Sequence, residues 1–291
     1  MMQTVVAGQA ENTPSAATTW AIKAMAYSAG RWTVGHDWVL EINVIDSQHS
    51  KPKVLTLGAD PAWSPDGRTI AFCYNRSGEG SEIYTISADG SDRNQLTHRK
   101  GGSGACSPTW SPDGSRIAFS GNDGKSSRSA VFVMDREGSN VQRLTEGYWP
   151  QWSPDGKQLA LFRAPKGPGN KSSVWVVNAD GSQPMQLTDE KFINWEPSWT
   201  ADGRILFSSN REGNSAIFVM SRDGTNLRKL AHAAKYDLYA PGLSPDGKLL
   251  VVDATAELRG SVILLLDLVG GEQPRTVGFG THPSVVWTQR P

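Results

Sequence analysis

The sequence lacks the features that mark a membrane protein, a secreted protein or a nucleic-acid-binding protein. Lysine plus arginine and aspartate plus glutamate both number 29, so the formal net charge is zero and no basic face for phosphates is predicted. The longest apolar run, residues 262–266, is far shorter than a membrane span. The first thirty residues show no basic start followed by an apolar stretch. We therefore expect no nucleic-acid partner and no membrane insertion. The sequence does not select a location: we expect a periplasmic or extracellular one if a signal peptide has been removed, and a cytoplasmic one otherwise.

Cysteine and catalytic motifs are also scarce. The two cysteines, Cys73 and Cys106, are too few for a disulfide framework. Both fall near the predicted channel face, so a bridge between them is the alternative, but we expect free thiols. The five histidines show no spacing typical of metal ligands. No Gly-x-Ser-x-Gly nucleophile elbow is present; residues 101–105 are the nearest stretch and lack the final glycine. The sequence therefore predicts no metal, no cofactor and no catalytic residue.

One short motif, Trp-Ser-Pro-Asp-Gly, is repeated along the chain. Its copies and variants stand at residues 63–67, 110–114, 152–156, 199–203 (Trp-Thr-Ala-Asp-Gly) and 243–247 (Leu-Ser-Pro-Asp-Gly), and Trp287 follows without the turn. The copies are 42 to 47 residues apart, which is the length of one four-stranded propeller blade.

Each repeat has the same internal order of predicted strands. A short first strand ends at the tryptophan, and the turn follows: proline presets φ, aspartate caps the backbone and glycine takes the left-handed position. In the copy at Trp110, the second strand covers residues 117–119, the third 131–134 and the fourth ends at 143–145. Both faces of the second and third strands are apolar, as expected for sheets packed between two neighbours. We expect the tryptophan to fill the gap between adjacent blades.

The two ends of the chain supply the remaining blade. Second, third and fourth strands are predicted at residues 25–27, 39–45 and 53–55, and a lone first strand at 284–287. We predict an all-β, six-bladed propeller of four-stranded antiparallel blades, closed by pairing of the N- and C-terminal strands. Residues 1–18 are expected to be a flexible tail and residues 19–291 a single propeller. Trp20 leaves an alternative open, because it fits a displaced copy of the motif.

These repeats resemble the TolB-type six-bladed propeller over roughly residues 20–290. The resemblance rests on WSPDG followed by IAF, a loop such as residues 209–214, then IFVM and Asp-Gly-x-x-x-x-x-Leu. It implies the fold. Because similar repeats also form the propellers of prolyl oligopeptidases, dipeptidyl peptidases and oligogalacturonate lyases, it does not select one function.

The segments that enter the first strands differ between repeats, which makes them the candidate site. The residue before each proline gives a ring of Asp60, Ser107, Trp149, Glu196, Ala240 and His282, with Tyr148, Trp195 and Tyr239 beside it. Aromatic faces stack on sugars and cations, and acids fix orientation. Arg76 and Arg211, in loops joining second to third strands, are candidates to clamp a carboxylate. The alternative is that the aromatics plug the channel or pack between blades.

The sequence favours a non-catalytic binding or scaffold module, a monomer that presents its channel face to a protein, peptide or glycan. A first alternative is a carbohydrate-active enzyme similar to a polysaccharide lyase, using His282 with Asp60 or Glu196. A second alternative is the propeller part of a larger receptor or peptidase.

Overall fold

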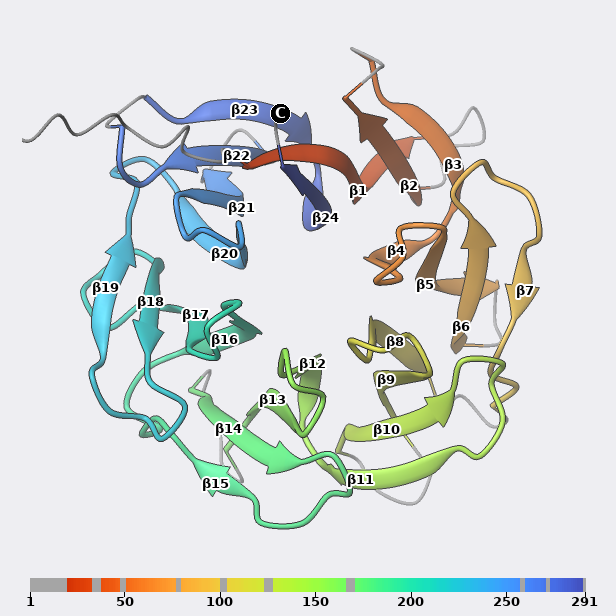
Figure 1. The fold of residues 1–291 in the computed structure, drawn as a ribbon, viewed down its shortest axis with the longest axis horizontal. Helices are drawn as coiled ribbons and strands as arrows, with labels where there is room; N and C mark the ends of the chain where they lie inside the picture. The colour runs from red at the N-terminus through yellow and green to blue at the C-terminus, as the bar shows by residue number, and fades with distance from the viewer. Residues whose placement is uncertain are drawn as a thin grey trace, which may run out of the picture.

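The described chain folds into six four-stranded antiparallel sheets that surround a central channel (Figure 1). The computed structural model describes residues 20–32, 38–47, 51–76, 80–99, 104–122, 128–165, 171–256, 260–270 and 273–289. The predicted tail, 1–18, lies outside these ranges. Within them, no helix is long and apolar enough to cross a membrane. The six-bladed propeller predicted from the repeats is confirmed.

The first three blades run from the chain closure through the first two Trp-Ser-Pro-Asp-Gly motifs. Blade 1 consists of β24 (Thr281–Gln289), β1 (Trp20–Trp32), β2 (Trp38–Asp46) and β3 (Lys53–Leu57). Blade 2 consists of β4 (Ala59–Trp63), β5 (Thr69–Arg76), β6 (Gly80–Ser87) and β7 (Asn94–Gln95). Blade 3 consists of β8 (Ala105–Trp110), β9 (Arg116–Gly121), β10 (Ala130–Asp135) and β11 (Gln142–Glu146).

The other three blades continue in the same order, with the first strand of each nearest the channel (Figure 1). Blade 4 consists of β12 (Tyr148–Trp152), β13 (Gln158–Arg163), β14 (Ser173–Asn178) and β15 (Met185–Gln186). Blade 5 consists of β16 (Asn194–Trp199), β17 (Ile205–Ser209), β18 (Ala216–Met220) and β19 (Arg228–Ala231). Blade 6 consists of β20 (Asp237–Leu243), β21 (Leu249–Ala256), β22 (Gly260–Asp267) and β23 (Arg275–Phe279).

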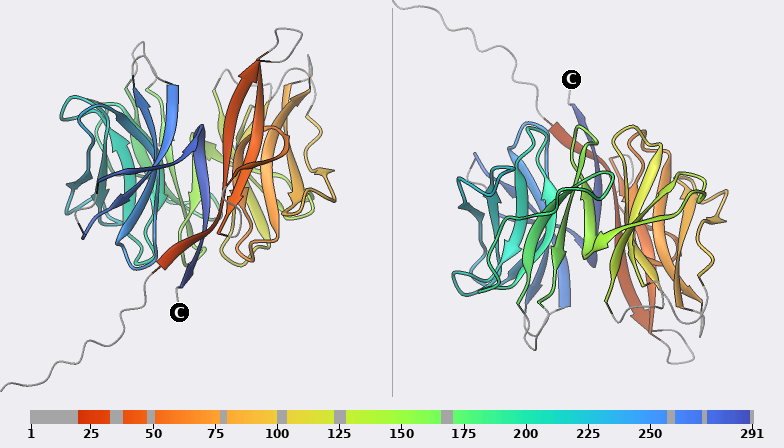
Figure 2. Two further views of the ribbon diagram at one scale, coloured as in Figure 1. Left: turned by 90° about the horizontal axis from the view of Figure 1, so that it is seen from above. Right: turned by 90° about the horizontal axis from the view of Figure 1, so that it is seen from below.

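Blade 1 closes the ring with strands from both ends of the chain. β24 pairs antiparallel with β1, so that Trp20 lies opposite Gln289 and Met25 opposite Val285. The start of β1 and the end of β24 therefore project from the same face of the molecule (Figure 2). Trp20 begins a second strand and is not a displaced copy of the first-strand motif. The predicted closure by the two chain ends is confirmed.

The Ser-Pro-Asp-Gly turns are built by the same hydrogen bonds in successive blades. In blade 3, the Ser111 hydroxyl donates to Asp113 Oδ1 at 2.6 Å, and the amide of Ser115 donates to the same oxygen at 3.0 Å. Gly114 has a φ of 69°, a conformation that costs glycine little. Ser64 and Asp66 repeat the arrangement in blade 2 with a 2.6 Å hydrogen bond. Each turn is thus a local unit specified by its own four residues.

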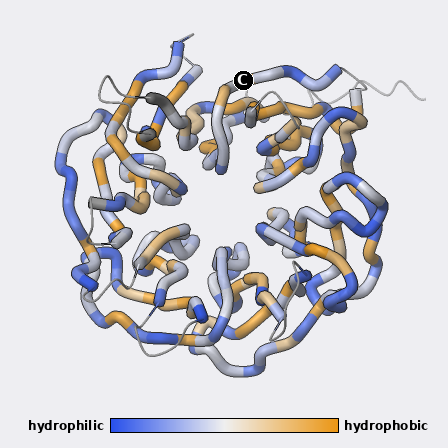
Figure 3. The backbone as a smooth tube through the Cα atoms, turned by 180° about the vertical axis from the view of Figure 1, so that it is seen from behind, coloured by the Kyte–Doolittle hydropathy of each residue, from blue (hydrophilic) through white to orange (hydrophobic). Residues whose placement is uncertain are grey.

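The core lies between neighbouring blades, where hydrophobic segments of facing sheets meet (Figure 3). Consecutive residues 117–119 are all fully buried, because both faces of β9 are covered. The indole of Trp110 reaches back to blade 2 and donates from Nε1 to the carbonyl of Ala62 at 3.1 Å. Trp199 makes the equivalent bond to Gln151 at 2.9 Å. Trp110 and Trp199 therefore join adjacent blades, as the sequence predicted, whereas the buried Nε1 atoms of Trp63 and Trp152 have no hydrogen-bond partner within the described residues.

Candidate functional site

Every first strand contains a bulge at the residue before its proline. Register shifts occur at this point in all six blades. The residues at the bulge are Asp60, Ser107, Trp149, Glu196, Ala240 and His282, with φ between 46° and 54°. A non-glycine residue rarely adopts this left-handed conformation, which costs on the order of 1 kcal/mol or more. The ring predicted from the sequence is thus a sixfold backbone feature, and we refer to these six residues as the ring.

Side chains of neighbouring second strands hold the ring in place. The amide of Asp60 donates to the Ser28 hydroxyl at 2.9 Å, and the amide of Trp149 donates to the Ser120 hydroxyl at 2.8 Å. At Ala240, the acceptor is the Glu196 carboxylate of the preceding blade, at 2.8 Å. Amides that a bulge removes from the strand ladder therefore find partners.

The ring stands at one end of a central cavity of about 450 Å³. The cavity is lined by all six ring residues, by residues that follow them in the first strands, and by turn prolines such as Pro65, Pro154 and Pro245. Residues that precede the ring in the same strands do not line it. The cavity extends from the ring toward the Ser-Pro-Asp-Gly turns, whose prolines line its other end.

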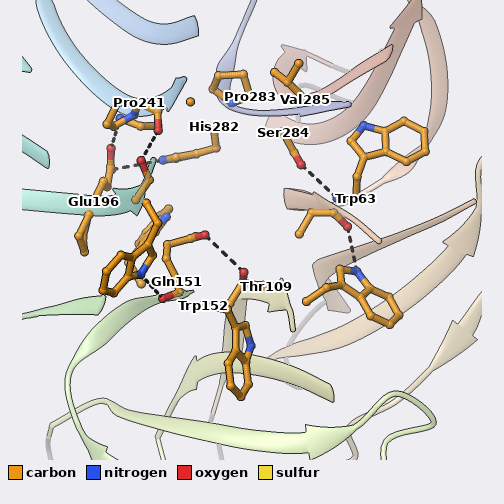
Figure 4. Close-up of a pocket in the computed structure, with 18 of the residues that line it drawn as sticks. Trp63, Thr109, Gln151, Trp152, Glu196, Pro241, His282, Pro283, Ser284 and Val285 are labelled. Atoms are coloured by element: carbon orange, nitrogen blue, oxygen red, sulfur yellow. Dashed lines mark hydrogen bonds and ion pairs between the residues drawn. The ribbon is translucent and has the colours of Figure 1, made fainter. Parts of the chain in front are cut away.

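Five ring side chains lie in contact across the channel, and Figure 4 shows two of them, His282 and Glu196, pointing toward each other. His282 lies between two carboxylates: its Nδ1 is 3.2 Å from Asp60 Oδ1, and its Nε2 is 3.6 Å from Glu196 Oε1. The Trp149 ring centroid is 4.8 Å from that of the imidazole. Ser107, another residue of the ring, donates a hydrogen bond from its hydroxyl to Asp60 Oδ2 at 3.0 Å. The imidazole thus separates the two acids, so they do not form a directly paired acid and base.

The carboxylates around His282 keep it protonated. Burial alone would lower the pKa of His282, but the nearby carboxylates of Asp60, Glu196 and Asp253 outweigh burial and raise that pKa to about 9. At neutral pH, one imidazolium faces three acids. No lysine or arginine is among the residues that line the cavity. This end of the channel therefore has an excess of negative charge.

Asp253 is a site residue that the sequence reasoning missed. It lies on β21 opposite Tyr239, is 4% exposed, and its Oδ1 has no hydrogen-bond partner within the described structure. Burial raises the pKa of Asp253 to about 6. The sequence feature that could have revealed Asp253 is an acidic residue within an otherwise apolar second strand, Leu-Leu-Val-Val-Asp at residues 249–253. Ser28 and Ser120 hold the equivalent position in other blades.

The predicted aromatic residues form a run beside the ring, outside the cavity lining. Tyr148 stacks on Phe162 with ring centroids 5.3 Å apart, and Phe162 is 6.3 Å from Trp195. Tyr239 continues the run at 6.2 Å from Trp195, and burial raises the pKa of Tyr239. Trp195 is 38% exposed. These aromatics therefore pack largely on one another, with one indole open to solvent. Phe162, which connects them, was not predicted.

Neither of the two predicted arginines, Arg76 and Arg211, is seen to contact the ring among the residues that the structure describes. The side chain of Arg76 lies outside the described part of the structure. Arg211 donates to Asn194 Oδ1 at 2.8 Å and to the Ser209 hydroxyl at 3.1 Å, and its guanidinium lies 4.9 Å from the Phe218 ring centroid. Burial lowers the pKa of Arg211. This guanidinium is bound within blade 5, so we do not include it in the site.

The expectation of free thiols is wrong. Cys73 on β5 and Cys106 on β8 form a disulfide with their Cα atoms 4.9 Å apart, within the usual range for such bridges. The residues are 33 positions apart in sequence and belong to neighbouring blades. Because only the packing of blade 2 on blade 3 sets their separation, spacing along the chain could not reveal the pair.

With the fold and ring in place, the chain can be compared with known proteins. The family model of the TolB beta propeller domain matches residues 36–149 and 147–276. Since these matches span most of the chain, the protein belongs to the TolB beta propeller domain family.

Individual relatives are similar mainly in fold. The putative TolB from Agrobacterium tumefaciens superposes with a TM-score of 0.67 at 20% identity, over 93% of this chain and 99% of that chain. A hydrazine synthase chain from Kuenenia stuttgartiensis gives 0.73 at 16% identity, over 93% of this chain and 47% of that one. An uncharacterized peptidase of Bacillus subtilis, YuxL, is 47% identical over 38 residues, which are 13% of this chain and 6% of the peptidase. The structural matches show the propeller fold alone, and the chain matches only a small part of the peptidase.

Proposed function

We propose that this propeller is a non-catalytic binding module whose channel takes a positively charged segment of a partner polypeptide. The observation that carries the proposal is the group of acids at the ring: Asp60 and Glu196, and Asp253 on the neighbouring strand β21, surround a single imidazolium at the end of a cavity of about 450 Å³. A cavity of this size is typical of ligand sites. An ammonium or guanidinium group of a ligand would complement the excess negative charge.

Trp149 gives the site a second means of recognising a cation. Its indole lies against His282 and lines the same cavity, and aromatic faces attract cations. The turns and the motif tryptophans hold the blades together, so the fold does not depend on an aromatic side chain at position 149. A peptide or protein ligand is therefore favoured over a neutral glycan, for which the net charge gives no advantage.

The test is a binding titration with short peptides that carry a free amino terminus and lysine, beside acetylated, acidic and neutral-glycan ligands. We expect the cationic peptides to bind and Glu196→Gln to weaken binding by about tenfold or more, as the loss of a charged hydrogen bond does. Trp149→Ala should also weaken it. Glu212→Gln is the matched control, because Glu212 is exposed and pairs with Lys229 away from the ring. Equal affinity of all variants and ligands would contradict the proposal.

The lyase alternative receives no specific support. The described histidines outside the ring, His98 and His232, are exposed and follow the outer strands β7 and β19. His36 and His49 lie outside the described residues. His282 is protonated and held between two acids, which does not suit a catalytic base at neutral pH.

A further inference from the structure

A second group of potential ligand atoms lies beside the ring, where blades 2 and 3 meet. Cys73 and Cys106 are disulfide-bonded, and Oδ2 of Asp60 is 3.3 Å from the sulfur of Cys106. One ligand atom from each of the three residues falls within 4.8 Å of the others. Of the described residues, these alone form a group of three or more cysteine, histidine or acidic side chains so close together.

The repeat architecture brings the three residues to one point. Ala59 on β4 pairs with Cys73 on β5, so the bulge at the next residue, Asp60, lies beside that cysteine. Cys106 comes from the next blade, one residue before the ring, and its strand β8 packs against β5. Cys73 is 3% exposed and the side chain of Asp60 is 13% exposed. The group is therefore a sheltered site at the side of the channel.

The carboxylate in this group has no role toward a disulfide. A disulfide carries no charge and has no proton to donate. Two thiolates and a carboxylate, by contrast, form an anionic ligand set of sulfur and oxygen atoms, all of which zinc(II) binds in proteins. The other oxygen of Asp60, Oδ1, is 3.2 Å from His282 Nδ1, so the imidazole fixes the orientation of the carboxylate. Metal-ligating side chains are commonly oriented by such a partner.

We propose that the reduced chain binds zinc(II) or a similar cation through Cys73, Cys106 and Asp60, and that the disulfide form does not. Ligand atoms around one zinc ion lie roughly 3–4 Å apart, since Zn–S is about 2.3 Å and Zn–O about 2.1 Å. In the disulfide form, one ligand atom from each residue already lies within 4.8 Å of the others, but the two sulfurs are bonded to each other and must move apart to hold an ion. Reduction frees the sulfurs to separate, and three protein ligands leave one position of a tetrahedral site for water.

Oxidation releases the metal in a balanced exchange. A small-molecule disulfide accepts two electrons from the two thiolates, the Cys73–Cys106 bond forms, and the bond within the small disulfide breaks. Its two sulfurs leave as thiols after taking up two protons from water, and the zinc ion is released. The channel end of the propeller thus exists in a metal-bound reduced form and a metal-free oxidised form. This inference does not depend on the proposed peptide ligand.

Cobalt(II) is the probe of choice for the test, because thiolate ligation gives it a charge-transfer absorption band. The full chain is reduced with a phosphine, two free thiols are confirmed by titration, and cobalt(II) is added without oxygen. We expect one cobalt per chain, a thiolate band that zinc(II) abolishes by displacement, and no band for the oxidised chain. Cys73→Ser and Cys106→Ser should each lose about half of the band.

The role of Asp60 is tested by affinity. Asp60→Asn should retain the thiolate band but weaken zinc binding by at least about tenfold, whereas Glu212→Gln should bind as wild type does. Circular dichroism of each variant establishes that it is folded. The wild-type chain also tests the proposal without any substitution, because its reduced and oxidised forms are compared for cobalt binding. A reduced chain with two titrated thiols and no cobalt band would overturn the proposal, and so would Asp60→Asn binding with wild-type affinity.

Discussion

The two ends of the first strands, the turn end and the ring end, differ in how strongly the backbone conformation depends on particular side chains. At the turn end, residues such as Ser111 and Asp113 recur with the same hydrogen bonds from blade to blade. At the ring end, the backbone is equally regular, with φ of 46° to 54° in all six blades, but the side chains range from Ala240 to Trp149. A turn needs its side chains to form, whereas the bulge is fixed by strand pairing and neighbouring strands. The fold therefore constrains the backbone of the ring more closely than the identity of its side chains.

The largest expected effect is a loss of stability when a tryptophan that joins two blades is removed. Trp110→Ala removes an indole that is 7% exposed and bonded to Ala62. We expect a loss of about 3–5 kcal/mol in the free energy of unfolding, measured by denaturant titration. Trp195→Ala, at a site 38% exposed, is the control and should cost less than about 1 kcal/mol. Similar losses in both variants would contradict the assignment of Trp110, and not Trp195, to the scaffold.

The next effect is the pH dependence contributed by His282. Because the pKa of His282 is raised from 6.5 to about 9, its stabilisation is complete below about pH 6.5 and is lost as pH rises to about 9. We expect the stability advantage of wild type over His282→Gln to shrink by on the order of 2 kcal/mol over that range. Denaturant titrations at several pH values measure it.

The same pKa can be observed directly by NMR titration of the imidazole. Glu196→Gln removes one of the acids that raise the pKa of His282, so the midpoint should move down toward 6.5. Glu212→Gln should leave the midpoint unchanged. An ordinary pKa for His282 in the wild-type protein would show that the acids do not enclose it.

A smaller effect is expected at the turn end. Asp113→Ala removes the acceptor of the Ser111 hydroxyl and the Ser115 amide and should cost about 1 kcal/mol, as the loss of a capping side chain does. These hydrogen bonds lower the pKa of Asp113 from 3.8 to about 2. The stabilisation is therefore present above pH 3.8 and is lost as pH falls to about 2. Unfolding curves at pH 7 and pH 2.5 should show the variant approaching wild type in acid.

The smallest expected effect is a gain in stability when the left-handed backbone conformation at one ring residue is relieved. Ala240→Gly relieves a φ of 46°, and after subtraction of the entropy that glycine loses on folding we expect stability to rise by about 0.5–1 kcal/mol. Ala62→Gly, in a first strand but without a positive φ, should instead lower stability by a similar amount. Thermal unfolding of the pair gives the comparison. Changes of the same sign would show that the ring backbone is unstrained.

Much of the fold was predictable because each blade is local in sequence. Strands, turns and their order follow from residues within one 42- to 47-residue repeat, and the sixth blade followed from the strands left over at the two ends. The ring was also found, as the residue before each proline. The Cys73–Cys106 disulfide and the role of Asp253 were not, because both depend on how one blade packs against another.

The sequence by itself determined the number of blades, the closure by both chain ends and the identity of the ring, because repeats fix hydrogen bonding within a blade. Tertiary structure decided what the ring side chains do. Residues such as Asp60, Glu196 and His282 are far apart in sequence, and sixfold arrangement around the channel alone brings their charges together. The raised pKa of His282 follows from that proximity, which no spacing along the chain encodes.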